Sequence, residues 1–224
     1  MVFPASKQPL VVGVVSDAQT WRSLAAEELP CDVVELRVDA LPETDRRLPL
    51  SIPCPKPLLL TLRHQSEGGA CEWDTAARLQ LAQELLPAAA MLDWEIARLP
   101  GAEQLLRAAK ELGVAVVASA HYFHSTPPLS EMLALATQAR AAGADVVKIA
   151  FTPLSEQDMD TGLAFLQQCP APAAAMGMGA EFGPKSRALY SAHGSALLYG
   201  YLGNRPSAPG QLSAAACRAM LTGV

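Results

Sequence analysis

Lysine, and charge in general, is scarce in this sequence of 224 residues. Only 17% of the residues are charged, Lys and Arg together number 17, and the formal net charge is −5. A protein that binds nucleic acid needs clustered Lys and Arg to displace the counterions of the phosphate backbone. The sequence therefore predicts no nucleic-acid partner.

Long hydrophobic runs and paired cysteines are also missing. No run of about 18 uncharged apolar residues occurs, and the first ten residues hold two prolines and a lysine instead of the apolar stretch of a signal peptide. We expect a cytoplasmic protein without membrane contact. The 5 cysteines are scattered and form no CxxC pair, which indicates neither a disulfide framework nor a zinc site.

Short apolar runs and amphipathic stretches alternate along the chain, as in repeated βα units. Half of the residues are hydrophobic, which is enough to bury a sizeable core. The predicted strands are 10–15, 33–38, 58–63, 91–95, 114–121, 146–150, 171–176 and 195–199. The predicted helices are 74–86, 102–112, 129–142 and 156–168, with Gly113 and Gly143 at two helix ends.

Eight parallel strands in a chain this short favour a compact (β/α)₈ TIM barrel, with residues 1–224 as one domain. No GxGxxG motif follows the first strand, so a dinucleotide-binding fold is not indicated. The segment 41–57 contains five prolines and cannot hold a long helix, so one βα unit is irregular.

Polar residues alternate with apolar ones near the ends of five predicted strands. In a barrel strand the face packed on helices must be apolar, so the opposite face points into the barrel. Any one of these groups could be a structural ion pair, but five strands together predict a catalytic pocket at the C-terminal face. The inward residues are Glu35, Arg37, Asp39, Thr61, Arg63, Asp93, Glu95, Ser119, His121, Val146, Lys148 and Ala150.

Lys148 stands in the apolar run Val146-Val147-Lys148-Ile149-Ala150. Poor solvation there disfavours the ammonium and favours the neutral amine, which is the nucleophile of Schiff-base chemistry. The alternative is a structural lysine paired with Glu35, Asp93 or Glu95.

His121, at the end of the neighbouring strand, suits a general base because imidazole titrates near neutrality. His124 is a competitor, but it precedes Thr126-Pro127-Pro128 and is expected to face solvent. A metal bound by His121 and His124 is not indicated, because no third ligand lies close in the sequence. The segment 203–211 has the composition of a loop that either covers a ligand or is plain surface.

Seven sequence blocks, in this order along nearly the whole chain, resemble the signature of the type I 3-dehydroquinate dehydratases. The blocks are Glu35-Leu36-Arg37-Val38-Asp39, Thr61-Leu62-Arg63 followed by Glu67-Gly68-Gly69, Ser119-Ala120-His121, Phe123 with Thr126-Pro127, 143–150, Ser186-Arg187 and Ser207-Ala208-Pro209-Gly210-Gln211. The resemblance implies a barrel, usually a homodimer, that converts 3-dehydroquinate to 3-dehydroshikimate in the shikimate pathway of aromatic amino acid biosynthesis, with no metal and no organic cofactor.

The same resemblance implies a role for each site residue. Lys148 would form an iminium with the substrate's C3 ketone, His121 would move protons, and Glu67 would orient His121. The substrate-binding residues would be Glu35, Arg37 and Arg63 for the hydroxyls, Arg187 for the carboxylate, and Ser207 and Gln211 from the last loop.

Two alternatives stay open from the residues. A class I aldolase also uses a barrel lysine as an imine, although Arg187 and the SAPGQ segment suit a carboxylate better than the phosphate that such aldolases commonly bind. A binding protein that has lost turnover is the other alternative. It is motivated by Tyr122, which stands where the family usually has Asp after the catalytic His.

Overall fold

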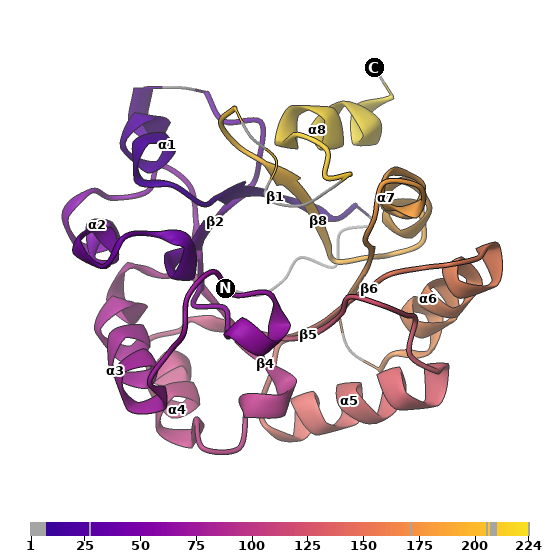
Figure 1. Ribbon diagram of the computed structural model, residues 1–224, viewed down its shortest axis with the longest axis horizontal. Helices are drawn as coiled ribbons and strands as arrows, with labels where there is room; N and C mark the ends of the chain where they lie inside the picture. The colour runs from indigo at the N-terminus through magenta and orange to yellow at the C-terminus, as the bar shows by residue number, and fades with distance from the viewer. Residues whose placement is uncertain (1–7, 27, 171, 205, 207–209, 224) are drawn as a thin grey trace.

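The computed structural model of the protein describes residues 8–26, 28–170, 172–204, 206 and 210–223. Strands and helices alternate along the chain, and the helices surround a ring of strands (Figure 1). The strands are β1 (Leu10–Val15), β2 (Val33–Arg37), β3 (Leu58–Thr61), β4 (Met91–Glu95), β5 (Ala115–Tyr122), β6 (Val146–Phe151), β7 (Ala173–Gly177) and β8 (Leu197–Tyr201). The helices are α1 (Ala18–Ser23), α2 (Leu48–Ser51), α3 (Thr75–Leu85), α4 (Glu103–Glu111), α5 (Leu129–Ala141), α6 (Glu156–Gln168), α7 (Phe182–Ala192) and α8 (Ala214–Thr222).

The strands form one parallel sheet that is nearly closed into a barrel. Each strand pairs with its neighbours in the order β7-β6-β5-β4-β3-β2-β1-β8. At the remaining seam, the backbone N–H of Ala196 donates to the carbonyl of Ala173 at 2.7 Å. The predicted (β/α)₈ barrel is therefore confirmed.

The predicted elements match the structure with small shifts at their ends. The bounds of β1, β4 and α6 are those predicted, whereas β2 and β3 end one and two residues early. Val38 begins a short 3-10 helix, and the backbone N–H of Arg63 donates to Asp39. Gly113 and Gly143 follow α4 and α5 with φ of 71° and 90°, the left-handed region that glycine adopts without strain. The proline-rich segment 41–57 holds only the short α2.

Alternation along the strands separates two hydrophobic cores. The larger core lies between the sheet and the helices and includes Leu36, Leu60, Leu92 and Ile149. The smaller core fills part of the barrel interior and includes Val33, Leu59, Met91, Val117, Val146 and Tyr199. Further along the same inward faces the side chains become polar, and this change of chemistry positions the candidate site.

No helix in the described part of the chain is both long and apolar enough to serve as a membrane span.

Candidate active site

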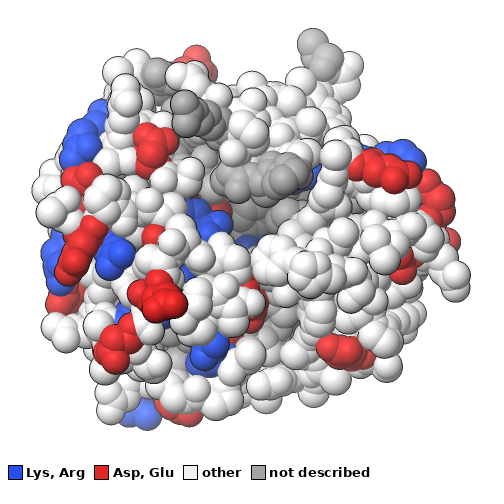
Figure 2. Space-filling view, in the orientation of Figure 1, with Lys and Arg blue, Asp and Glu red and all other residues white. Residues whose placement is uncertain are grey.

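A small cavity opens at the C-terminal ends of the barrel strands. Its volume is about 160 Å³. The space-filling view shows a hollow at the centre of this face with Lys or Arg side chains visible inside it (Figure 2). Eight of the nine residues predicted for the site line this cavity, whereas Ser207 lies outside the described residues. The eight are Glu35, Arg37, Arg63, Glu67, His121, Lys148, Arg187 and Gln211.

Lys148 is buried and forms an ion pair inside the barrel. Its Nζ donates to Oδ2 of Asp93 at 2.7 Å, and only 3% of the lysine side chain is exposed. Of the three carboxylates weighed from the sequence as structural partners, the structure selects Asp93 as the partner of Lys148. The lysine thus has a counter-ion inside the barrel, and Lys148 is also one of the residues that line the cavity.

Asp93 is shared by three neighbours. Oδ1 accepts a hydrogen bond from Ser119 Oγ at 2.6 Å and lies 2.9 Å from Nη2 of Arg63. Burial alone would raise the pKa of Asp93, but the charges of Arg63 and Lys148 hold its pKa well below the ordinary range. Asp93 is therefore ionised at neutral pH and pairs with both Arg63 and Lys148.

His121 and Glu67 form a second pair on the cavity wall. Nδ1 of His121 lies 2.9 Å from Oε2 of Glu67, although 54 residues separate them in sequence. Burial lowers the pKa of His121 well below its usual value, and the charges of Arg63 and Lys148 lower it further. Burial raises the pKa of Glu67 to about 7. A neutral imidazole with Nδ1 occupied leaves Nε2 as the nitrogen that can act as a base.

Glu35 and Arg37 of β2 are held by hydrogen bonds from neighbouring polar groups. Thr61 Oγ1 donates to Oε1 of Glu35 at 2.7 Å. Arg37 makes a two-pronged contact with Asp39, at 2.9 and 2.7 Å, and also donates to the carbonyl of Gly68. Asp39 thus holds Arg37 in place and links it to the loop that carries Glu67.

Arg187, on α7, is a buried cation with no ion-pair partner among the residues described. Its Nε donates to the carbonyl of Tyr199 at 3.2 Å and its Nη1 to that of Gly183 at 2.8 Å. The other cations of the cavity each have a carboxylate: Arg37 has Asp39, while Arg63 and Lys148 share Asp93. A buried unpaired charge is costly, so the surroundings of Arg187 favour an anionic ligand.

Glu95 lies beside the cavity residue Arg63, as expected for an inward residue, but it does not itself line the cavity. Its carboxylate accepts hydrogen bonds from the His64 backbone N–H at 2.8 Å, from Nη1 of Arg63 at 3.4 Å and from Nη2 of Arg78, on α3, at 2.5 Å. The buried guanidinium of Arg78 is therefore a second ion-pair partner of Glu95, from outside the strands.

His124 is exposed, as expected from the sequence, and does not line the cavity. The hydroxyl of Tyr122 donates to Glu131 of α5 at 2.7 Å, on the opposite side of β5 from His121. Tyr122 therefore does not contribute to the cavity wall. Within the described residues, no three His, Cys, Asp or Glu side chains gather in a way that could hold a metal ion.

Sequence reasoning missed several cavity residues. Phe123 was named only in a signature block, and Met176, Met178 and Tyr199 were not considered as cavity residues. Asp93 does not line the cavity, and its contact with Lys148 was weighed only as a structural pair. Alternation along β8 could have found Tyr199, because it lies on the same face as Leu197 and opposite Leu198. The methionines carry no pattern that marks them as cavity residues.

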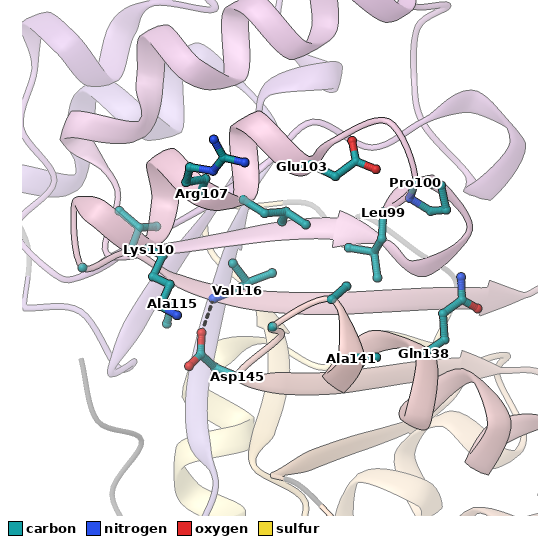
Figure 3. Close-up of a pocket in the computed structure, with 15 residues that line it drawn as sticks. Leu99, Pro100, Glu103, Arg107, Lys110, Ala115, Val116, Gln138, Ala141 and Asp145 are labelled. Carbon is teal, nitrogen blue, oxygen red and sulfur yellow. Dashed lines mark hydrogen bonds between the residues drawn. The ribbon is translucent and has the colours of Figure 1, made fainter.

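A larger recess of about 920 Å³ lies outside the barrel between α4 and α5 (Figure 3). Its lining includes Leu99, Leu106, Val114 and Val116, and Asp145 accepts a hydrogen bond from the Val116 backbone N–H at 2.8 Å on its wall. None of the predicted site residues line this recess. Size alone does not make this recess the active site, because Glu67 and His121, whose pKa values are shifted, lie together in the barrel cavity.

Comparison with known proteins points to a single family. The family model described as type I 3-dehydroquinase matches residues 11–223. The 3-dehydroquinate dehydratase of Methanothrix thermoacetophila is 33% identical over 208 residues, which cover 92% of this chain and 88% of that protein. The crystal structure of 3-dehydroquinate dehydratase from Geobacillus kaustophilus aligns with a TM-score of 0.84 at 26% identity and covers 96% of this chain and 90% of that one. The structure of 3-dehydroquinate dehydratase from Enterococcus faecalis aligns with a TM-score of 0.81 at 29% identity and covers 100% of this chain and 98% of that one.

Proposed function

The chain belongs to the type I 3-dehydroquinase family, and on that premise we propose that it dehydrates 3-dehydroquinate to 3-dehydroshikimate through an imine on Lys148. The protein is a hydro-lyase, since the reaction removes water from a hydroxy-keto acid. One observation supports the mechanism most directly: a buried amine, a neutral imidazole and an unpaired arginine all line the same small cavity.

Imine formation starts with the loss of a proton from Lys148. Asp93 accepts a hydrogen bond from Nζ but is a poor proton acceptor, because its pKa is held well below the ordinary range. His121 is the better base, since its imidazole is neutral and faces the same cavity. The freed amine attacks the C3 ketone, and the ketone oxygen leaves as water after protonation.

The iminium then makes elimination possible. A protonated imine withdraws electrons from C2, so that Nε2 of His121 can remove the neighbouring proton. The electron pair expels the C1 hydroxyl, which leaves as water with a proton from His121. Water finally hydrolyses the imine, which releases 3-dehydroshikimate and restores the Lys148 amine.

The other site residues bind and orient the substrate. Arg187 pairs with the substrate carboxylate, which supplies the anion that its buried guanidinium lacks. Glu35, Arg37 and Arg63 hydrogen-bond the ring hydroxyls, and an analogue without those hydroxyls would leave buried polar groups unpaired. Gln211 contacts the substrate from the last loop, and Ser207 is proposed to do the same on the resemblance alone.

The family resemblance also extends to the setting of the reaction. We assign the step to the shikimate pathway, which leads to aromatic amino acids, in a cytoplasmic homodimer that needs no metal or organic cofactor.

The test combines product formation with trapping of the intermediate. Purified protein is mixed with 3-dehydroquinate, the ultraviolet absorbance of the conjugated enone is followed, and a parallel sample is reduced with borohydride for peptide mass mapping. We expect enone formation and a reduced adduct on Lys148. Lys148→Ala should lose both signals, whereas Lys185→Ala should keep both because Lys185 is an exposed partner of Glu156.

Each other result has a defined meaning. An adduct on Lys148 without enone would contradict turnover and support the binding-protein alternative. Enone formation without a Lys148 adduct would overturn the imine mechanism. Absence of both signals with wild-type protein, combined with cleavage of aldol donors, would favour the aldolase.

A further inference from the structure

Tyr199 of β8 is a buried aromatic residue that lines the same cavity as Lys148. It pairs with Val12 of β1 in the parallel sheet, and only 4% of it is exposed. Its carbonyl accepts hydrogen bonds from Arg187 Nε at 3.2 Å and from Cys217 Sγ at 3.6 Å. The backbone of Tyr199 is therefore fixed, which holds the ring against the barrel interior.

The Tyr199 hydroxyl differs from those of two other tyrosines in the protein. It is buried and has no hydrogen-bond partner among the described residues. By contrast, the buried hydroxyl of Tyr190 donates to the carbonyl of Met159 at 3.0 Å, and that of Tyr122 donates to Glu131 at 2.7 Å. A buried hydroxyl without a partner is destabilising. Because Tyr199 lines the cavity, a ligand bound there is the group that can supply the partner.

The ring of Tyr199 lies next to the reacting amine. Nζ of Lys148 is 4.6 Å from the ring centroid, within the range of a cation–π contact. Burial raises the pKa of Tyr199 well above its usual value, and the negative charges of Glu35 and Asp93 raise it further. The hydroxyl therefore keeps its proton at neutral pH and is available as a donor.

We propose that Tyr199 is a further catalytic residue, whose hydroxyl donates a hydrogen bond to the oxygen on the substrate carbon that Lys148 attacks. This inference rests on the proposed function, because it needs a ketone at that position. The ketone oxygen is the substrate oxygen that must lie close to Nζ at the moment of attack, and the Tyr199 ring already borders Nζ.

The proposed step needs no additional reactant. The lone pair of Nζ forms the carbon–nitrogen bond while the carbonyl π electrons move to the oxygen. The Tyr199 hydroxyl stabilises the negative charge that develops there without transferring its own proton, since its pKa is high. The oxygen takes the proton that His121 removed from Lys148, which gives a carbinolamine, in the manner of an oxyanion stabilised by a fixed donor. His121 then moves a proton from the carbinolamine nitrogen to this oxygen, and the nitrogen lone pair expels it as water to form the iminium.

Tyr199→Phe tests the proposal because it removes a single oxygen atom. The rate of imine formation is measured by mixing enzyme and 3-dehydroquinate, reducing with borohydride at set times and quantifying the Lys148 adduct by mass. We expect this rate and kcat/KM to fall by about 100-fold to 1,000-fold, as when one fixed donor is lost. Thermal unfolding of the free variant should show no loss of stability, since no bond of the hydroxyl is broken.

Tyr190→Phe is the matched control. It removes a buried tyrosine hydroxyl that is bonded and does not line the cavity. We expect the control to unfold at a lower temperature but to form the imine at the wild-type rate. The opposite behaviour of the two variants would separate a chemical role from a structural one.

Two results would overturn the proposal. Imine formation at the wild-type rate in Tyr199→Phe would show that the hydroxyl does not act on the ketone oxygen. A raised KM with unchanged imine formation at saturating substrate would assign the hydroxyl to ground-state binding instead. If wild-type protein gives neither enone nor adduct, the proposed function itself fails, which is a different outcome from a normal Tyr199→Phe variant.

Discussion

At the scale of single residues, the charge balance of the barrel interior depends on Asp93. This carboxylate is the partner of Lys148 and lies within 2.9 Å of Arg63, and both cations are almost completely buried. Removing one partner of a buried ion pair leaves the other charge without compensation, which costs far more than breaking a solvated pair. Asp93 therefore supports the fold and the reacting lysine together.

Asp93→Asn should lower the free energy of unfolding by about 3–5 kcal/mol, because Arg63 and Lys148 lose their anion. Urea unfolding measures the effect. Asp45→Asn is the matched control, since Asp45 pairs with an exposed Arg22 and should cost less than about 1 kcal/mol. Equal small effects from the two substitutions would contradict the role given to Asp93.

The protonation of Glu67 should set the acidic limit of activity. Its carboxylate accepts the Nδ1 proton of His121 and leaves Nε2 free as the base. The pKa of Glu67 is raised to about 7, so its protonated form accumulates as the pH falls below that value. A protonated carboxyl would donate to Nδ1 and move the ring proton to Nε2, where the base is needed. As the pH is lowered, we therefore expect kcat/KM to fall with an apparent pKa near 7. This apparent pKa belongs to the coupled pair of Glu67 and His121.

Glu67→Gln removes this titration while its amide oxygen can still accept the Nδ1 proton. The acidic limb of the kcat/KM profile should therefore move to lower pH, where His121 itself is protonated. Glu103→Gln, an exposed carboxylate on α4, should leave the profile as in the wild type. An unshifted limb in Glu67→Gln would assign the limit to another group.

At the scale of elements, the loop after β3 positions Glu67. The backbone N–H of Gly69 donates to the His64 carbonyl at 3.0 Å, and that of Ala70 donates to Asp39 at 3.0 Å. The chain passes so close to its own strand at Gly69 that a Cβ there would clash with the Arg63 carbonyl oxygen, at 2.3 Å. Glycine is required at this position for lack of space, not for its φ angle.

Gly69→Ala should displace the loop and separate Glu67 from His121. We expect kcat/KM to fall by about 100-fold, since a shift of about 1 Å in a catalytic group has an effect of that size. Gly113→Ala is the control: it strains a positive φ but meets no atom within 4 Å, so it should reduce stability only. Wild-type kinetics in Gly69→Ala would show that the loop tolerates the side chain.

The local sequence predicted the strands and the helices α3 to α6 well, because each is determined by short-range periodicity and capping, whereas α1, α7 and α8 were not named from the sequence. Asp74 accepts from the Ala77 N–H and Ser155 from the Asp158 N–H at the starts of α3 and α6, where the hydrophobic pattern begins. The end of β3 was less predictable. Arg63 continues the alternation, but its backbone N–H donates to Asp39 instead of to a strand neighbour.

At the scale of the whole molecule, we predict a homodimer, which is the usual state implied by the family resemblance. Sedimentation equilibrium should give twice the 23.6 kDa of one chain. A mass of one chain, with full activity at the same concentration, would contradict the prediction and show that one barrel is sufficient for the reaction.

The sequence by itself determined the eight strands and the face on which the polar strand residues lie. Hydrophobic periodicity decides both, because apolar side chains must face the helices and polar ones then point into the barrel. Lys148 and His121 could be identified in this way since they lie on adjacent strands. Glu67, Arg187, Ser207 and Gln211 lie outside the predicted strands, and only the family resemblance suggested them.

Only the tertiary structure decided which charges meet. Asp93 and Lys148 are 55 residues apart, and Glu67 and His121 are 54 apart, so their pairing depends on how the sheet curves and closes. The same closure placed Glu95 between Arg63 and Arg78. Among the described residues, it left Arg187 without a carboxylate and the Tyr199 hydroxyl without a hydrogen-bond partner. Alternation along a strand decides which way a side chain points, whereas the curvature of the barrel decides what it reaches.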